Sequence, residues 1–588
     1  MSPARLAGLG VSPGIAVGEP VVQETRPIVV LRIPLPVAKV EDEVKRFHLA
    51  VEATIARIIE NRDHAARQMG EEYATIFEAH HLIAADSSLL DPVCDMIRTE
   101  RVNAEWAVDQ VVARLVKKFE ALPDQYLAER KLDVLDVSSQ ILGTLHGQDP
   151  SKLENLDGPV ILVADDLLPS TAVKLPLDKV LAFVLEMGGP TSHTTIIARS
   201  LGIPVIVGAH GACEAGHHSR RMIVDAFEGK IIFDPDPAEE AEYISRLNEH
   251  LEQKAQLQEV RTLPTITRDG REVSLLANID LLTEVDEAVH WNVAGVGLYR
   301  SEFLYMQRSP ALPDEDDHAE VYRNLVSSMG GRPVTIRTFD LGGKKLAREV
   351  TGSDEANPVL GLRGIRLCFS KPDFFATQLR GLLRAAGEFP PGRIRIMFPL
   401  ISCIEEFKLA KLLVRRLTDD LRNEGYKVQE HIPLGAMVEV PAAAVMAEEM
   451  ACEADFLSIG TNDLIQYSLA VDRANELVAD LYRPTSPAVL RLIAKVIKAG
   501  ADRGIDVAMC GEMASDPLMV PLLLGLGLKR FSMNPLAVPK IRSLIRQLSA
   551  KETSSMAKKA LKLTTAREVE EFLLEKLALS LAKIKIRV

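Results

Sequence analysis

Short strand-like runs recur through the last part of the chain, and most of them end in polar or charged residues. Eight runs can be counted: VSLLANID, GVGLYRSEF, VTIRTFD, IRIMFPL, LGAMVEVP, FLSIGTND, DVAMCGEM and RFSMNP. Helical stretches such as CIEEFKLAKLLVRRL separate them, so each strand-plus-helix unit takes about 40 residues. We therefore expect residues 265–588 to form a (β/α)8 barrel with its active site at the carboxyl ends of the strands.

The remainder of the 588 residues predicts further domains, because a chain of this length is too long for one compact core. Residues 1–34 and 147–237 contain strand-like runs such as PVILVAD and VLAFVLE, which indicate one discontinuous, swivelling α/β domain. Between them, residues 35–146 repeat apolar positions at steps of three and four, so we expect an inserted helical bundle. Residues 238–264 are rich in Glu and Gln and predict an exposed helical linker. The fold class is thus multidomain α/β.

The composition is that of an ordinary soluble globular protein, with 26% charged and 47% hydrophobic residues. A formal net charge of −13 argues against a nucleic-acid surface. The N-terminal MSPARLAGLGVSPG lacks the apolar core of a signal peptide, and no apolar run reaches membrane-spanning length. The six cysteines form no CxxC pair, as is typical of a reducing compartment. We expect a cytoplasmic protein with neither nucleic acid nor membrane as a partner.

Four arginines occur at or near the ends of the predicted strands, and together they indicate an anion site. A single arginine is more often a partner in a surface salt bridge. Four guanidinium groups around one barrel mouth would repel one another unless a multiply charged anion lay between them. The planar guanidinium suits phosphate and carboxylate groups. The residues concerned are Arg300, Arg337, Arg363 and Arg473.

Two carboxylates and a thiol occupy neighbouring strand ends. Glu439 and Asp463 offer the oxygen ligands that Mg²⁺ prefers, although without the arginines a structural salt bridge would be an equally good explanation. With the arginines, we expect a metal that bridges protein carboxylates to a phosphorylated substrate. Cys510, in AMCGEMASD, could act there as a proton donor or as a nucleophile.

One histidine lies in a setting that favours phosphorylation. In MGGPTSHTTIIARS, Thr191 and Ser192 are natural helix caps, so His193 falls in the first turn of a predicted helix. The helix dipole keeps the imidazole neutral there, and the free N–H groups of the turn would stabilise a phosphoryl group. A lone histidine in a loop is more often structural, so the inference depends on this position. A P-loop is absent from the sequence, and the phosphoryl donor need not be ATP.

Seven motifs, which lie in the same order along nearly the whole chain, resemble Enzyme I of the bacterial phosphotransferase system. GGPTSHTTIIARSLGIPVIVG resembles the phosphohistidine signature of that family. The others resemble its barrel motifs: GVGLYRSEFLY, RTFDLGGKK, NPVLGLRGIR, MVEVPAA, FLSIGTNDLIQYSLAVDRAN and CGEMASD. Pro190 and Leu135 depart from residues that are frequent in the family.

The resemblance implies a function and a role for each matched residue. His193 would accept the phosphoryl group of phosphoenolpyruvate and pass it to a histidine of the phosphocarrier HPr, as the first step of sugar uptake. Cys510 would protonate the departing enolate of pyruvate, while Glu439 and Asp463 would hold Mg²⁺. HPr would dock on the inserted bundle, and the barrel would form a homodimer. The expected substrate-binding residues are Arg300, Arg337, Arg363, Asn462, Arg473 and Lys345.

Two alternatives remain open from the sequence. A regulatory, nitrogen-type Enzyme I would feed a non-sugar carrier, and GLGVSPGIAVGEP near Met1 is expected to leave no space for the usual sensor domain. A scaffold that senses phosphoenolpyruvate without turnover would need neither His193 nor Cys510. Pyruvate phosphate dikinase and phosphoenolpyruvate synthase share the histidine and barrel parts, but residues 1–150 are too short and too helical for their ATP-binding domain.

Overall fold

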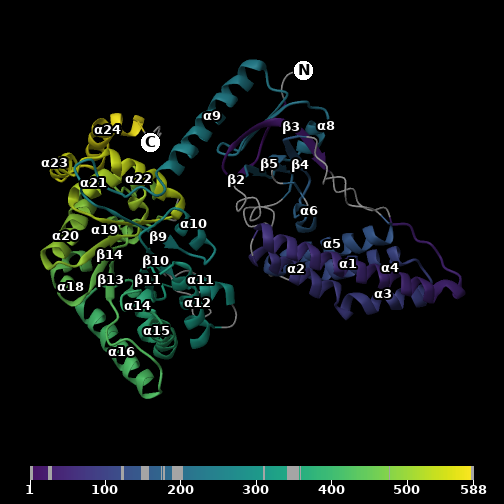
Figure 1. Cartoon of the computed structure of the whole chain (residues 1–588), viewed down its shortest axis with the longest axis horizontal. Coiled ribbons are helices and arrows are strands. Elements are labelled where there is room, and N and C mark those ends of the chain that lie inside the picture. The colour runs from purple at the N-terminus through teal and green to yellow at the C-terminus, as the bar shows by residue number, and fades with distance from the viewer. Residues whose placement is uncertain are drawn as a thin grey trace. The chain divides into compact units, whose positions relative to one another are not determined.

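The structure, a computed structural model, forms two compact units, Met1–Glu252 and Gln253–Val588 (Figure 1). Of the helices in its described part, none combines the length and the apolar character needed to cross a bilayer. The structure describes residues 4–23, 30–69, 71–120, 125–147, 158–173, 175–176, 179–187, 203–308, 312–340, 357, 359–473, 475 and 477–583.

An eight-stranded mixed sheet forms one part of the first unit, and its strands follow in the order β1-β8-β7-β3-β4-β5-β6-β2. The long strand β3 joins the two halves, because Ile15–Gly18 pairs antiparallel with β7 while Glu19–Gln23 pairs parallel with β4. The strands are β1 (Ala4–Ala7), β2 (Leu9–Ser12), β3 (Ile15–Gln23), β4 (Val160–Ala164), β5 (Val180–Leu185), β6 (Val205–Val207), β7 (Met222–Asp225) and β8 (Lys230–Phe233). Two short helices accompany the sheet, α6 (Pro169–Ala172) and α8 (Ala212–His217).

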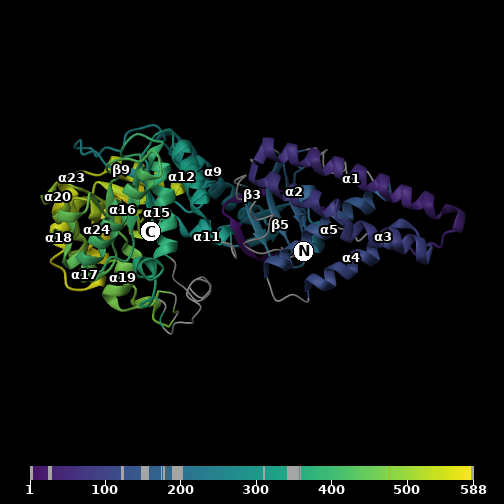
Figure 2. The ribbon, with the colours of Figure 1, turned by 90° about the horizontal axis from the view of Figure 1, so that it is seen from below.

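Five helices between β3 and β4 form a bundle, in which α1 packs on α2 and α3 packs on α4 (Figure 2). Apolar residues at helical spacing, such as Phe47, Ile58 and Ile141, are fully buried between them. The helices are α1 (Val40–Met69), α2 (Glu71–Ala84), α3 (Ser87–Glu100), α4 (Ala104–Glu120) and α5 (Gln125–Leu145), with a short 3-10 turn, η1 (Val37–Lys39), before the first.

The second unit contains a closed barrel in which every strand pairs parallel with the next, and β16 pairs with β9 to close the ring. The eight strands coincide with the eight runs of the sequence, so the predicted barrel is confirmed. They are β9 (Ser274–Ile279), β10 (Val296–Arg300), β11 (Val334–Arg337), β12 (Ile394–Phe398), β13 (Leu434–Val438), β14 (Phe456–Ile459), β15 (Asp506–Met509) and β16 (Arg530–Met533).

Helices surround the barrel and bury one apolar face each. In α20, for example, Val489, Ile493 and Val496 are fully buried at steps of three and four residues. The helices of this unit are α10 (Glu284–His290), α11 (Glu302–Arg308), α12 (Glu315–Ser328), α14 (Gly364–Ser370), α15 (Pro372–Gly387), α16 (Ile404–Asn423), α17 (Pro441–Val445), α18 (Ala447–Glu453), α19 (Thr461–Leu469), α20 (Pro487–Arg503), α21 (Met519–Leu526), α22 (Val538–Gln547), α23 (Ala550–Ala560) and α24 (Ala566–Lys583). Helix α9 (Pro237–Glu259) precedes them in the chain.

One buried arginine fixes the start of the barrel unit. Arg542 of α22 is 2% exposed, and its guanidinium donates hydrogen bonds to carbonyl groups from two separate segments. These acceptors are the carbonyl oxygens of Val260, Arg261, Trp291 and Asn292. Because a buried carbonyl without a partner is costly, this single side chain stabilises both the residues after α9 and the end of α10.

We expect Arg542→Met to lower the free energy of unfolding of the barrel unit by roughly 3 kcal/mol, since it removes the hydrogen bonds to one buried and three partly buried carbonyls. Urea unfolding of the full chain measures the shift in the midpoint of the barrel transition. The control is Arg546→Met on the same helix, whose partly exposed side chain donates, among the described residues, to the carbonyl of Pro264. Equal shifts for the two variants would contradict this role of Arg542.

Candidate active site

Strand β10 ends at Arg300 and strand β11 ends at Arg337, two of the predicted arginines. The two residues are register partners in the parallel ladder, so they lie at neighbouring strand ends. Arg300 donates to Asp280 at 2.9 Å, between Nη1 and Oδ2. Arg337 is nearly buried and forms an ion pair with Glu302, the second residue after β10. The two strand ends are therefore held by opposite charges.

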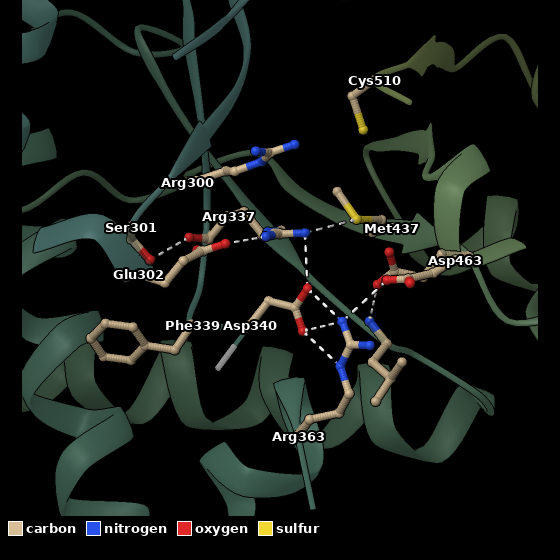
Figure 3. A network of polar contacts seen from close by, with 12 residues as sticks. Arg300, Ser301, Glu302, Arg337, Phe339, Asp340, Arg363, Met437, Asp463 and Cys510 are labelled. Carbon is tan, nitrogen blue, oxygen red and sulfur yellow. Dashed lines mark hydrogen bonds and ion pairs between the residues drawn. The ribbon is translucent and has the colours of Figure 1, made fainter. Parts of the chain in front are cut away.

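Asp340 joins Arg337 to Arg363, as Figure 3 shows. Its Oδ2 atom lies 3.0 Å from Nη1 of Arg337 and 2.9 Å from Nη2 of Arg363. Arg363, which directly precedes α14, also reaches Oδ2 of Asp463 at 3.1 Å. The hydroxyl group of Tyr467 lies 3.3 Å from Nη1 of Arg363 and fixes the other side of the guanidinium.

Glu439 and Asp463 lie close together, as the sequence predicted for their strand ends. Glu439 directly follows β13 and is 2% exposed, whereas Asp463 lies in the first turn of α19, just after β14. Together with Asp340 they offer three carboxylate oxygens that all lie within 4.8 Å of one another. We call Arg337, Asp340, Arg363, Glu439 and Asp463 the strand-end cluster.

The backbone beside the cluster is strained. Leu400, just after β12, has a φ of 55°, in the left-handed region that residues with a side chain rarely adopt. Its N–H donates to Oε1 of Glu439 at 2.6 Å, which helps to hold this conformation. Strain of this kind persists only where the surroundings fix it and is frequent at functional sites.

Burial and charge act against each other in the cluster. Burial by itself would lower the pKa of Arg337 and raise that of Asp340, but the attraction of the opposite charges reverses both shifts. The same balance raises the pKa of Arg363, which faces Asp340 and Asp463. Burial, together with repulsion by Asp463 and Asp340, raises the pKa of Glu439 to about 8.

The donors of the cluster fit a divalent cation of the Mg²⁺ type. Such an ion prefers carboxylate oxygens, and the three carboxylates can approach a common point. Burial, and after it the repulsion by Asp463 and Asp340, raises the pKa of Glu439, and a bound cation would favour its charged form. Glu439 and Asp463 were predicted as ligands, and Asp340 adds a third candidate.

Cys510 lies at the end of β15 and is 5% exposed. Its thiol receives a hydrogen bond from Ser458 Oγ at 3.4 Å and lies 3.7 Å from the carbonyl oxygen of Ile459. Burial raises the pKa of Cys510, so the thiol keeps its proton at neutral pH. The next residue, Gly511, packs closely against Thr461, because a Cβ at position 511 would lie 1.7 Å from Thr461 Oγ1.

Asn462 and Arg473 lie beside the cluster without joining its ion pairs in the described residues. The amide of Asn462 binds Glu512, with Nδ2 as donor at 2.9 Å and Oδ1 as acceptor at 3.1 Å. Arg473 is exposed, and its backbone N–H donates to Gln466. Tyr482 links the two residues, because its hydroxyl group donates to the Asn462 carbonyl and contacts the Arg473 side chain.

The remaining predicted residues, His193 and Lys345, lie outside the described residues, as does Pro190. The structure therefore leaves their predicted roles as expectations.

Several polar residues of this region were missed by the sequence reasoning. Asp340 ends the run VTIRTFD, so the rule that found Glu439 at a strand end would also have found Asp340. Glu302 also follows a strand, as the second residue after β10. Tyr467 comes from the interior of α19, and no sequence pattern marks it.

Three family models match successive parts of the chain. Residues 7–130 match the N-terminal part of PEP-utilising enzymes, and residues 156–229 match their mobile domain. Residues 254–550, which hold the strand-end cluster, match the PEP-binding domain of PEP-utilising enzymes.

Known proteins resemble the chain over nearly its full length. A phosphoenolpyruvate-protein phosphotransferase of Bacillus sp. (strain S) is 41% identical over 565 residues, which cover 96% of this chain and 97% of the relative. Proteins of the same name from Priestia megaterium and Bacillus subtilis (strain 168) are 41% and 40% identical, and each alignment covers 97% of this chain. These alignments span 98% and 99% of the two relatives. The chain therefore belongs to the phosphoenolpyruvate-protein phosphotransferase family, Enzyme I.

Proposed function

We propose that the chain transfers the phosphoryl group of phosphoenolpyruvate to its own His193, releases pyruvate, and then phosphorylates a histidine of the carrier HPr. Membership of the family supports the reaction. The observation that carries the site is a group of buried polar atoms which, in the described part of the chain, have no hydrogen-bond partner. A buried polar atom of this kind needs water, an ion or a ligand to complete it, and here four such atoms come from residues at the ends of β10, β11 and β14. They are Glu302 Oε2, Arg337 Nε, Thr338 Oγ1 and Thr461 Oγ1.

Phosphoenolpyruvate would bind at the strand-end cluster through its phosphate and carboxylate groups. The unpaired Nε of Arg337 is a buried donor ready for a substrate oxygen. Arg300 lies at the neighbouring strand end and is near enough to act electrostatically on Asp340. The further substrate-binding residues in this proposal are Arg363, Asn462, Arg473 and Lys345.

Glu439 and Asp463 would hold Mg²⁺, with Asp340 as a third candidate ligand. When bound, the cation would neutralise charge on the oxygens of the transferred phosphoryl group. The support from the structure is the set of three converging carboxylates and the raised pKa of Glu439.

The transfer forms an N–P bond to His193 and breaks the P–O bond of phosphoenolpyruvate. The neutral ring nitrogen attacks phosphorus, and the imidazole later gives up its N–H proton to water. The electron pair of the broken bond becomes the enolate of pyruvate, whose carbon then takes the thiol proton of Cys510. Solvent returns a proton to the thiolate. The buried, protonated state of Cys510 supports its role as the donor.

The proposed division of labour follows the predicted boundaries. Residues 1–34 and 147–237 would carry the phosphohistidine, residues 238–264 would connect it to the barrel, and residues 265–588 would bind substrate and form a homodimer. HPr would dock on the bundle of residues 35–146, and the protein would act in the cytoplasm.

A cavity in the bundle supports this docking site. It has a volume of about 300 Å³ and lies between α1 and α2. It is lined in part by Leu82, which is 70% exposed, and by Ile59, which is also exposed. Leu82 and Ile59 thus offer adjoining apolar surface at the rim of the cavity that a partner could cover.

Mixing the full chain with Mg²⁺ and phosphoenolpyruvate, without any carrier, should release about one pyruvate per subunit, because His193 can accept only one phosphoryl group. Pyruvate is measured by rapid quench, and the phosphate is located by mass spectrometry at neutral to basic pH. His193→Ala should still bind phosphoenolpyruvate and release none. Continuous release by the wild type, or equal release by the variant, would contradict the proposal.

Cys510→Ala should slow the release of pyruvate by roughly 10²–10⁴-fold, since a positioned proton donor contributes about that much to a rate. Binding of phosphoenolpyruvate, followed by calorimetry, should change little. Cys94→Ala is the control, because this thiol is buried to a similar extent but lies in α3 of the bundle. A rate for Cys510→Ala within twofold of wild type would rule out the thiol as the donor.

The stability of the metal-free protein should depend on pH through Glu439. The pKa of this carboxyl is raised to about 8 in the folded chain, from an ordinary value of 4.5. Between pH 4.5 and 8 the folded chain therefore holds a proton that unfolding releases. Its contribution to stability is therefore complete below pH 4.5 and is lost as the pH rises through 8. Thermal unfolding in EDTA should show a weaker fall in Tm from pH 5.5 to 8.5 for Glu439→Gln than for wild type. Identical slopes would show that Glu439 does not titrate in this range.

A further inference from the structure

Gln378 is a polar side chain in the buried face of α15 that belongs to none of the proposed substrate or metal contacts. It is fully buried, and its neighbours on the same helix face, Phe375, Leu379 and Leu382, are fully buried apolar residues. A buried amide destabilises a protein unless its polar atoms are hydrogen-bonded. Its position therefore requires defined partners.

The amide of Gln378 has three such partners. Its Oε1 accepts a hydrogen bond from the backbone N–H of Phe339 at 3.1 Å. Its Nε2 donates to the hydroxyl oxygen of Ser301 at 2.8 Å and to the hydroxyl oxygen of Tyr322 at 3.1 Å. Both N–H groups and the carbonyl are thus used, which fixes the orientation of the amide.

Two of these partners lie between residues of the proposed site. Ser301 stands between Arg300 and Glu302 in the sequence, and Phe339 stands one residue before Asp340. Ser301 Oγ also donates to the carbonyl oxygen of Arg337 at 2.8 Å, a bond that Figure 3 shows beside the Glu302 ion pair. One helix side chain therefore contacts the segments that follow both β10 and β11.

The position of these contacts matters because the strand ladder ends there. The last register pair between β10 and β11 joins Arg300 to Arg337, and the segments beyond it are outside the ladder. Beyond it, Thr338 still donates its N–H to the carbonyl of Met397, whereas Ser301 and the N–H of Phe339 are bound by Gln378. Gln378 therefore connects the two segments beyond the last paired residues of β10 and β11.

A second layer of residues fixes Gln378 itself. Tyr322 of α12 is fully buried, and its hydroxyl group lies 3.0 Å from Nδ1 of His318. Burial lowers the pKa of His318 to about 4, so the imidazole is neutral at pH 7. Its Nδ1 can therefore accept a hydrogen bond from the hydroxyl group of Tyr322. The helices approach closely at Gly381, where a Cβ would lie 2.5 Å from Cβ of His318.

We propose that Gln378 is a positioning residue for phosphoryl transfer: by bonding Ser301 and Phe339 at once, it sets the spacing between the strand ends that carry Arg300, Glu302, Arg337 and Asp340. Gln378 touches neither substrate nor metal in this proposal. The inference rests on the function proposed above, because it concerns the spacing of those site residues. A misplacement of about 1 Å in such a site reduces a rate by roughly 10²-fold.

The test compares rate with binding in Gln378→Met, which keeps the length of the side chain and removes all three hydrogen bonds. The single-turnover release of pyruvate with Mg²⁺ should fall roughly 10- to 100-fold. The Kd for phosphoenolpyruvate, measured by calorimetry, should rise less than threefold, because the arginines remain. Gln378→Glu offers a conservative comparison, since its carboxylate can still accept the Phe339 N–H bond, and it should retain part of the rate.

A control variant separates positioning from stability. Leu382→Val lies one turn further along α15, is equally buried and has no bond to the strand ends, so it should lower the Tm while the single-turnover rate stays within twofold of wild type. Ser301→Ala removes one of the links. Because Ser301 also bonds the carbonyl of Arg337, the double variant Ser301→Ala/Gln378→Met should lose more rate than Gln378→Met. If the two residues act in part through their shared contact, that loss should still be smaller than the product of the two single losses.

A wild-type rate in Gln378→Met, or equal losses of rate in Gln378→Met and Leu382→Val, would overturn the inference while leaving the proposed function intact. If Gln378→Met does not fold, Ser301→Ala is measured in its place, and a rate within twofold of wild type is then the overturning result. A wild-type chain that releases no pyruvate would overturn the proposed function and this inference with it.

Discussion

Guanidinium and carboxylate groups are buried together where the barrel strands end, and the proposed chemistry depends on this contact. Removed from water, either charge alone would be strongly unfavourable, so each needs the other. Asp340 lies between Arg337 and Arg363, while Arg363 reaches on to Asp463. The arrangement keeps two guanidinium groups charged and close together, as the recognition of a multiply charged anion requires.

The cluster also depends on structure behind it. The strand ladder brings Arg300 and Arg337 to adjacent positions, and the network through Gln378 holds the segments that follow. On the opposite side, Tyr467 contacts Arg363 and donates to the carbonyl of Val359. The charged side chains are thus supported by neutral hydrogen bonds from two helices, which can fix direction without adding charge.

Much of the barrel and part of the site could be predicted from the sequence. Most strands combine a short apolar run with a polar end, so the pattern predicted the eight strands and the positions of Arg337, Glu439 and Cys510. Gln378 could not be predicted, because one amide among apolar helix positions looks like any half-exposed residue until the packing is known. Tyr467 presents the same difficulty, since its partner Arg363 lies about a hundred residues away in the chain.

Other expectations rested on position near a strand end together with the resemblance. Arg473 was grouped with the other arginines in this way, and the structure places it in contact with Tyr482 on an exposed turn. His193 is outside the described residues, and its role rests on the motif around it and on family membership.

The exchange of isotopic label between pyruvate and phosphoenolpyruvate tests the central claim most directly. The full chain is incubated with Mg²⁺, phosphoenolpyruvate and labelled pyruvate, and no carrier is added. If the phosphoryl group moves reversibly between the barrel site and His193, label should appear in phosphoenolpyruvate with wild type and should be absent with His193→Ala. Exchange that persists in His193→Ala would contradict the account, because the phosphoryl group would then rest on some other acceptor.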